Sequence, residues 1–245
     1  MAVLSVLRAT ASLSSSLLLM LLLAACPVAA TEADEAPALP RLLPTPMGEP
    51  LPATKALLER LRSGGLVLLV RHERTGLDGR FDLTPYAPDR CERQRNLSVV
   101  GHASAVALGQ TLAQLRIPVG QIIASPYCRT LATALALDAR AERDARLIGP
   151  DPRIDRTQEQ VLVDLIALIA EHGTQVTNLV LVGHHGNFMP LTDEWLDEGE
   201  TMVLEPRGLG PPVPLARVTA ARLEEMVREY QRMDAITAAA PPEAP

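Results

Sequence analysis

Aromatic residues are scarce in this sequence, which holds one Trp, three Tyr and two Phe among 245 residues. This scarcity excludes a core of packed aromatic rings, so a folded domain has to fill its interior with Leu, Val, Ile and Ala. Such a composition is typical of helices packed on a buried sheet. The sequence also lacks an excess of positive charge, since its formal net charge is −6. A nucleic-acid partner attracted by the overall field is therefore excluded, whereas a local positive pocket is compatible with this total.

Long apolar runs are absent after residue 25, so no later segment has the roughly 18 apolar residues that a membrane span needs. Before that point Arg8 is the only charge, and 17–25 consists almost entirely of Leu, Met and Ala. This apolar stretch is too short for a comfortable span. A weakly positive start followed by an apolar stretch and small residues predicts a secretory signal at 1–25.

The end of this segment, Leu23-Ala24-Ala25-Cys26, resembles the lipobox of bacterial lipoproteins, in which the cysteine is lipidated and becomes the first residue of the mature protein. Each buried methylene of an acyl chain contributes ~0.8 kcal/mol, and two or more chains anchor a protein stably. We expect a membrane-anchored lipoprotein on the periplasmic side, held to the membrane by lipid on Cys26 alone. The alternative is ordinary cleavage near Ala30, which yields a soluble periplasmic or secreted protein.

The cysteines are few, and their number fits an oxidising compartment. Cys26 is lipidated or removed, which leaves Cys91 and Cys128 as an even pair. A bridge between them closes a loop of 37 residues, for which the chain-entropy model gives roughly 4 kcal/mol as an upper value. We expect this disulfide; two free buried thiols are the alternative.

The two ends of the chain do not read as parts of a fold. Residues 26–52 are rich in Pro and acidic residues, which predicts a linker. Residues 236–245, with Pro241 and Pro242, predict a disordered tail. One domain of about 180 residues remains at 53–235, long enough for a full core.

Helix and strand signals alternate along this domain. We expect helices at 53–62, 98–115, 127–137, 158–171 and 219–233, and strands at 66–70, 119–124, 179–182, 201–204 and 215–218. Alternation of this kind predicts an α/β fold, a three-layer sandwich with a mostly parallel central sheet and helices on both faces.

Two of the predicted strands run directly into histidines. The strand at 66–70 leads into Arg71-His72, and the strand at 179–182 leads into Gly183-His184. Ligands of open parallel sheets bind outside the carboxyl ends of the strands, so both histidines are expected at the functional edge. Arg71 lies beside the core, where an unpaired charge costs several kcal/mol, and it therefore needs an anionic partner.

Four motifs, in this order, carry a family resemblance: Leu69-Val70-Arg71-His72-Glu73-Arg74-Thr75, Cys91-Glu92-Arg93-Gln94-Arg95-Asn96-Leu97-Ser98-Val99-Val100-Gly101, Ser125-Pro126-Tyr127-Cys128-Arg129-Thr130 followed by Thr133-Ala134, and Val182-Gly183-His184-His185-Gly186-Asn187. They resemble the Arg-His signature and the three later motifs of the histidine phosphatase superfamily, which also holds the phosphoglycerate mutases. Each motif alone is weak, but their order and their placement at strand ends make the set specific. The resemblance covers roughly residues 66–205, and these versions look closest to an exported branch.

The resemblance implies a phosphatase that hydrolyses a phosphomonoester or a phosphohistidine, on a small phosphorylated substrate or a phosphoprotein. His72 would attack phosphorus as a neutral imidazole, and water would hydrolyse the phosphohistidine. Arg71, Arg95 and Arg129 would bind the phosphoryl oxygens, and His184 would donate to the same oxygens. Asn187 would bind the phosphate or orient a neighbouring turn. The resemblance implies no cofactor and no metal.

The sequence departs from the family pattern at two points. Glu73 stands where the family often has Gly, and it is a candidate for the general acid if its pKa is raised. The segment 138–155 contains four acidic residues in no recognisable context, so the general acid is otherwise unassigned. Three alternatives stay open: an anion-binding lipoprotein with little or no turnover, a metal site of His72, His184 and His185, and an exchange of roles between His184 and His185.

Overall fold

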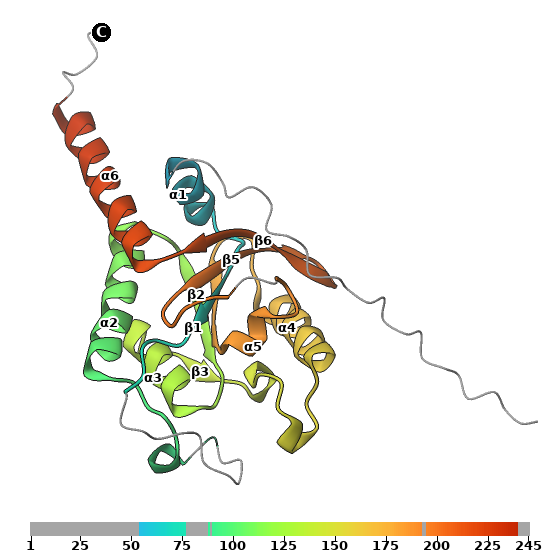
Figure 1. Cartoon of the computed structure of the whole chain (residues 1–245). Coiled ribbons are helices and arrows are strands. Elements are labelled where there is room, and N and C mark those ends of the chain that lie inside the picture. Colours follow the sequence, from blue (N-terminus) through green and yellow to red (C-terminus); the bar gives the residue numbers. More distant parts are fainter. Residues whose placement is uncertain (1–53, 77–87, 89, 193–194, 240–245) are drawn as a thin grey trace, which may run out of the picture. The chain divides into compact units, whose positions relative to one another are not determined.

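A computed structural model describes residues 54–76, 88, 90–192 and 195–239. The predicted signal, the lipobox with Cys26 and the linker lie outside the described residues. Figure 1 shows the chain coloured along its sequence. None of the described helices is long and apolar enough to cross a membrane.

Six strands form a single sheet in the spatial order β3-β2-β4-β1-β5-β6. In chain order they are β1 Val67–Arg71, β2 Val119–Ala124, β3 Glu142–Arg143, β4 Asn178–Gly183, β5 Thr201–Arg207 and β6 Gly210–Val218. The neighbours from β3 to β1 pair in parallel, while β5 pairs antiparallel with both β1 and β6. The sheet is thus mostly parallel in its centre with an antiparallel hairpin at one edge, which confirms the predicted α/β class.

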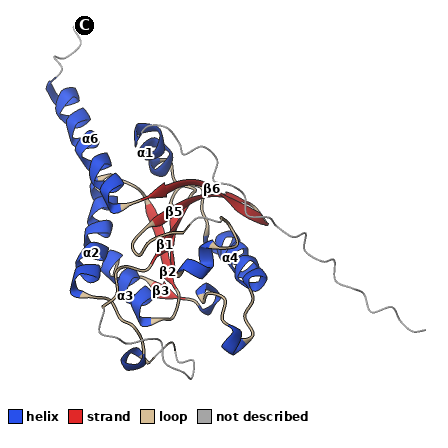
Figure 2. Cartoon of the chain, in the orientation of Figure 1, coloured by secondary structure: helices blue, strands red, loops and turns tan. Residues whose placement is uncertain are grey.

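Helices cover both faces of this sheet (Figure 2). They are α1 Thr54–Arg62, α2 Val99–Gln114, α3 Cys128–Leu137, α4 Gln158–His172, the short α5 His185–Phe188, and α6 Ala220–Ala239. Side chains alternate between the faces along a strand. Accordingly, Leu68 and Val70 pack with α1, α2, α3 and α6, whereas Val67 and Leu69 pack with α4. Two apolar clusters on either side of one sheet make the three predicted layers.

Local signals explain where the helices begin. The Ser98 side chain accepts a hydrogen bond from the Gly101 backbone N–H at 3.0 Å and starts α2. Thr157 and Gln160 form a reciprocal capping box that starts α4. Both helices begin where the sequence predicts them within one residue. These caps matter for the site because they fix the segments that lead into it.

The structure corrects the predicted C-terminal boundary. Residues 236–239, which the sequence assigns to a disordered tail, belong to α6. The reason is the high helix propensity of the Ala-rich end of this segment; Pro241 and Pro242 stand beyond it. The two-residue strand β3 was not predicted because it is too short to give a period. The remaining predicted helices and strands are present.

Candidate active site

The two predicted histidines meet at the carboxyl ends of β1 and β4. These strands lie side by side in parallel, with Arg71 opposite Gly183. The His72 backbone N–H donates to Gly183 O at 3.0 Å, which extends the strand pairing by one residue. His184 follows Gly183, and the two imidazole rings stand edge to face with centroids 5.6 Å apart. Main-chain pairing therefore holds both rings at one edge of the sheet.

The imidazole of His72 is held neutral with one nitrogen available for reaction. Its side chain is 2% exposed, and its Nδ1 lies 2.9 Å from Glu73 O. Because a carbonyl oxygen only accepts, Nδ1 carries the proton and the lone pair is on Nε2. Burial, followed by the positive charge of Arg129, lowers the pKa of His72 to about 3. A neutral imidazole with an unprotonated Nε2 is a nucleophile across the physiological pH range.

The imidazole of His184 has the opposite tautomer. Arg129 Nη2 lies 3.3 Å from Nδ1, and because a guanidinium only donates, Nδ1 accepts this hydrogen bond. The proton is then on Nε2, which donates to Ser125 Oγ at 2.9 Å. Removal from bulk water, and next the charge of Arg129, hold the pKa of His184 well below its usual value. An anion that draws the guanidinium away would free Nδ1 and raise this pKa.

Arg129 and Arg71 are the two arginines that lie deepest in the site. Arg129 is 7% exposed at the start of α3, and its guanidinium lies 4.8 Å from the centroid of the Tyr127 ring. Arg71 ends β1, and burial lowers its pKa. Its Nη1 donates to Leu196 O, while its Nε is buried with no hydrogen-bond partner within the described part of the chain. A buried cation with an unused donor suits an anionic ligand.

Arg95 reaches the same site from the loop that precedes α2. Its side chain is 39% exposed, and its Nη2 lies 3.3 Å from Glu198 Oε1. The charges of Arg129, Arg71 and Arg95 all lower the pKa of His72, and the same three lower that of His184. The structure therefore brings together the two histidines and three arginines that the sequence singles out.

Glu198 is a site residue that the sequence reasoning missed. Its carboxylate accepts from the Thr75 N–H and the Thr75 hydroxyl, both at 3.1 Å. Besides facing Arg95, it lies 4.0 Å from His72 Nδ1. The only available signal was the acidic run Asp197-Glu198-Gly199-Glu200 before β5, which reads as an ordinary exposed turn. Its role here is to orient Arg95 and to offset part of the positive charge.

Glu73, the candidate general acid, faces away from the arginines. Burial raises the pKa of its carboxyl group, as that role requires. However, the carboxylate packs on Gly199, where an added Cβ would lie 2.7 Å from it. It lines a cavity of about 360 Å³ that has neither Arg129 nor His184 in its wall. The structure therefore does not place Glu73 among the groups that would contact a phosphoryl ligand.

Asn187 and His185 act on the turn after β4. Asn187 is 1% exposed, and its Oδ1 accepts from the His184 N–H at 2.7 Å. Of its two predicted roles, the structure shows the orientation of the turn. The His185 ring stacks on Trp195 with centroids 3.8 Å apart and burial lowers its pKa. It is His184, and not its neighbour, that faces His72 and Arg129.

A cleft of about 530 Å³ opens beside Arg129 and His184. Tyr127 and residues 148–153 also line it. Among the described residues that line it, Asp151 is the only carboxylate, and Arg153 donates to both of its oxygens. These hydrogen bonds lower the pKa of Asp151, so it is held ionised and unsuited to donating a proton. The cleft can accept a leaving group, while the general acid stays unassigned.

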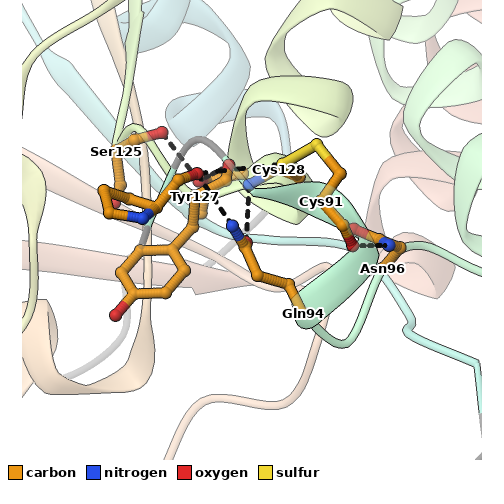
Figure 3. Close-up of a disulfide and its surroundings, with 8 residues drawn as sticks. Cys91, Gln94, Asn96, Ser125, Tyr127 and Cys128 are labelled. Atoms are coloured by element: carbon orange, nitrogen blue, oxygen red, sulfur yellow. Dashed lines mark hydrogen bonds between the residues drawn. A yellow bond between two sulfur atoms is a disulfide. The ribbon is translucent and has the colours of Figure 1, made fainter. Parts of the chain in front are cut away.

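The predicted disulfide is present (Figure 3). Cys91 and Cys128 are bonded with Cα atoms 5.5 Å apart. One half lies in the short 3₁₀ helix Cys91–Arg93 and the other is the first residue of α3. The bridge thus joins the segments that carry Arg95 and Arg129, and the expectation of a 37-residue loop is confirmed.

The alternative metal site finds no support in the arrangement of side chains. Among the described residues, no three His, Cys, Asp or Glu side chains are grouped so that they could hold a metal ion. His72 Nδ1 and His184 Nε2 are directed at Glu73 O and Ser125 Oγ, and His185 is stacked away from both.

No protein-family model matches the sequence, and no curated protein matches it. Solved structures similar to this chain include the protein histidine phosphatase SixA complexed with tungstate, at 16% identity and a TM-score of 0.49, covering 64% of this chain and 99% of that one. A mycobacterial glucosyl-3-phosphoglycerate phosphatase is 19% identical with a TM-score of 0.42, covering 58% and 90%. YhfR from Bacillus stearothermophilus is 16% identical with a TM-score of 0.45, covering 63% and 95%.

Two of these three proteins are named as phosphatases. At such identities and scores we draw no conclusion about chemistry from the likeness, because proteins of one fold carry many functions. The arrangement of His72, His184 and the three arginines in this chain is what indicates the chemistry of the site.

Proposed function

We propose that this chain is a phosphatase of the histidine phosphatase type, which hydrolyses a phosphomonoester or a phosphohistidine through a covalent intermediate on His72. The observation that carries this proposal is the state of His72: a buried neutral imidazole, protonated on Nδ1, that lies in the field of three arginines. A structural histidine has no need of three surrounding guanidinium groups. A nucleophile that attacks a dianionic phosphoryl group does, because the arginines stabilise the charge on the oxygens.

The proposed reaction has two displacements at phosphorus. In the first, the lone pair of His72 Nε2 forms an N–P bond while the bond from phosphorus to the leaving group breaks, and the leaving atom takes the electron pair. In the second, water attacks phosphorus, the N–P bond breaks, its electron pair returns to Nε2, and the proton that water loses passes to the solvent. Arg71, Arg95 and Arg129 hold the equatorial oxygens throughout. Once Arg129 turns from Nδ1 towards the ligand, His184 can take up a proton from solvent on Nδ1 and donate to the same oxygens.

The cleft between Tyr127 and residues 148–153 is the proposed site of the leaving group. Among the described residues of its wall, no carboxyl group is available to donate a proton, because Asp151 is ion-paired with Arg153. Leaving groups that are stable without a proton should therefore react best. This feature also favours the second candidate, a protein that binds phosphate or another anion in the same pocket and turns over little.

We further propose that the protein is exported and anchored through lipid on Cys26. The support is the sequence at 1–26 together with the disulfide, which forms in oxidising compartments. Labelled palmitate should be incorporated into the full chain in a bacterial host and not into its Cys26→Ala variant. Unlabelled protein in the periplasmic fraction would indicate ordinary cleavage, and retention in the cytosol would contradict export.

The test of the enzymatic proposal is turnover of para-nitrophenyl phosphate by the purified full chain and two variants. His72→Ala should reduce kcat by ~10³-fold or more, since it removes the nucleophile. His102→Ala is the matched control, because this histidine is exposed on α2, and it should leave the rate unchanged. Equal turnover by the wild type and His72→Ala would contradict the mechanism. Phosphate binding without turnover by the wild type would favour the second candidate.

A further inference from the structure

The segment that carries Arg95 has little packing of its own. Its 3₁₀ turn Cys91–Arg93 buries no residue, and Cys91 is exposed. Its far end is held by an isolated bridge between Leu97 and Thr75. Gln94 is the exception within this stretch, with 2% exposure. Few apolar contacts mean a low local stability, so other interactions must define where Arg95 lies.

Two interactions fasten this segment to the start of α3, and Figure 3 shows both. The first is the Cys91–Cys128 disulfide. The second is Gln94, whose Oε1 accepts from the Cys128 N–H at 2.9 Å while its Nε2 donates to Pro88 O at 2.8 Å. The N-cap residue of α3, Tyr127, makes no side-chain capping bond. Gln94 therefore satisfies, from a distant segment, one of the N–H groups that a helix start leaves unpaired.

An arginine of the anion site follows each of these attachment points directly in the sequence. Arg95 follows Gln94, and Arg129 follows Cys128. Both arginines act on the same imidazole, since both lower the pKa of His72. A shift of about 1 Å in a group that holds a substrate costs up to roughly 10²-fold in rate. The disulfide and Gln94 therefore set the distance between Arg95 and Arg129, and this distance should affect how well the site binds an anion.

We propose that the Cys91–Cys128 disulfide and Gln94 form a positioning clamp, which sets Arg95 against Arg129 so that the anion site is complete only in the oxidised protein. The inference rests on the proposed function, because it concerns the same anion site. The clamp residues do not touch the ligand themselves. Breaking the bridge should therefore weaken anion binding while the sheet, with His72 and His184 at its edge, stays folded.

Inorganic phosphate is the probe, and calorimetry gives its Kd for the full chain before and after reduction. Dithiothreitol converts the bridge into two thiols and is itself oxidised to its cyclic disulfide. The reduced protein should bind phosphate ~3-fold to ~10-fold more weakly, with the loss of activity in KM more than in kcat. Far-UV circular dichroism and the fluorescence of Trp195 should remain those of the folded protein. A Cys91→Ser/Cys128→Ser variant should bind as weakly as the reduced protein and show no response to dithiothreitol.

A second variant keeps the test decisive if the reduced chain unfolds. Gln94→Ala retains the bridge and should weaken phosphate binding by ~3-fold to ~10-fold, whereas Gln110→Ala, an exposed glutamine on α2, should have no effect. Unchanged binding by Gln94→Ala and by the folded reduced protein would overturn the clamp.

A merely structural role is separated from positioning by a double-mutant cycle with Arg95→Ala. If the clamp acts through Arg95, its removal should cost little phosphate affinity in the Arg95→Ala background. An equal cost in both backgrounds would show that the bridge affects binding independently of Arg95 and would overturn the proposal. Absence of phosphate binding by the oxidised wild type would instead contradict the proposed function itself, and the clamp with it.

Discussion

The two sides of the candidate site are built in different ways. On the strand side, Arg71, His72 and His184 lie at the ends of buried strands, and main-chain hydrogen bonds to Gly183 and Glu200 fix where the chain goes. Arg129 belongs to this side because it is buried and hydrogen-bonded to His184. On the loop side, Arg95 extends from a segment with little buried surface that a disulfide and Gln94 hold in place. Strand pairing therefore positions the strand side, whereas two attachments to α3 position the loop side.

Because of this difference, we expect the strand side to determine catalysis and the loop side to adjust ligand affinity. The buried strand side shifts pKa values strongly, because removal from water and the nearby arginines disfavour a charged imidazole. Arg95 is 39% exposed and has Glu198 as a competing partner, so solvent and the carboxylate weaken its contribution. We therefore expect changes on the strand side to abolish catalysis and changes on the loop side to tune it.

The largest effect in this comparison should come from Arg129, the arginine that is buried against His184. Arg129→Ala removes a donor from a site with little water and should reduce kcat/KM for para-nitrophenyl phosphate by ~10²-fold to ~10³-fold. Arg140→Ala, a fully exposed arginine just beyond α3, is the control and should behave as the wild type. A loss of less than ~10-fold for Arg129→Ala would mean that the deep arginine does not hold the reacting group.

An effect of intermediate size should appear in the pH dependence of stability. The unfolded chain takes up a proton on His72 below its usual pKa of 6.5, but the folded chain does so only near its lowered pKa of about 3. Stability is thus lost as the pH falls between these values. From pH 7 to pH 4 the loss from this residue should be about 3 kcal/mol.

Urea unfolding of the wild type and of His72→Asn at both pH values measures this loss. The two proteins share all other titrating groups, so the difference between their pH dependences isolates residue 72. Asn retains a side-chain N–H that can donate to Glu73 O. An identical pH dependence in the two proteins would show that His72 is not held neutral by the fold.

The smallest effect should come from Arg95. Arg95→Ala should raise KM for para-nitrophenyl phosphate by about 10-fold and change kcat less, because an exposed ion pair contributes modestly. Steady-state kinetics at low and high salt tests this reason, because added salt should raise the KM of the wild type towards that of the variant. A loss in kcat as large as that of Arg129→Ala would remove the distinction between the two sides.

The sequence predicted the strand side of the site better than the loop side. The strands β1 and β4 are apolar runs, and the histidines that end them are visible without a structure. The start of α2 is equally local, because Ser98 and Gly101 lie three residues apart. Gln94, Glu198 and Trp195 gave no such signal. Their roles come from contacts with Cys128, Arg95 and His185, which are not neighbours in the sequence and are brought together by the fold.

The proposed general acid shows the limit of residue-by-residue reasoning. Glu73 follows the nucleophile directly, and burial raises its pKa as the sequence argument required. Successive residues after a strand nevertheless need not face the same way. While His72 faces the arginines, the Glu73 carboxylate packs on Gly199. The side-chain direction, and not the chemical type, decides its role.

The central claim is that His72 becomes covalently phosphorylated, and trapping that intermediate tests it most directly. The full chain, mixed with ³²P-labelled substrate and quenched within milliseconds in alkali, should retain label that is released by acid, and mass spectrometry should locate the phosphoryl group on His72. His72→Ala should retain none. Turnover with no acid-labile label on residue 72, or with the label on another residue, would contradict the mechanism.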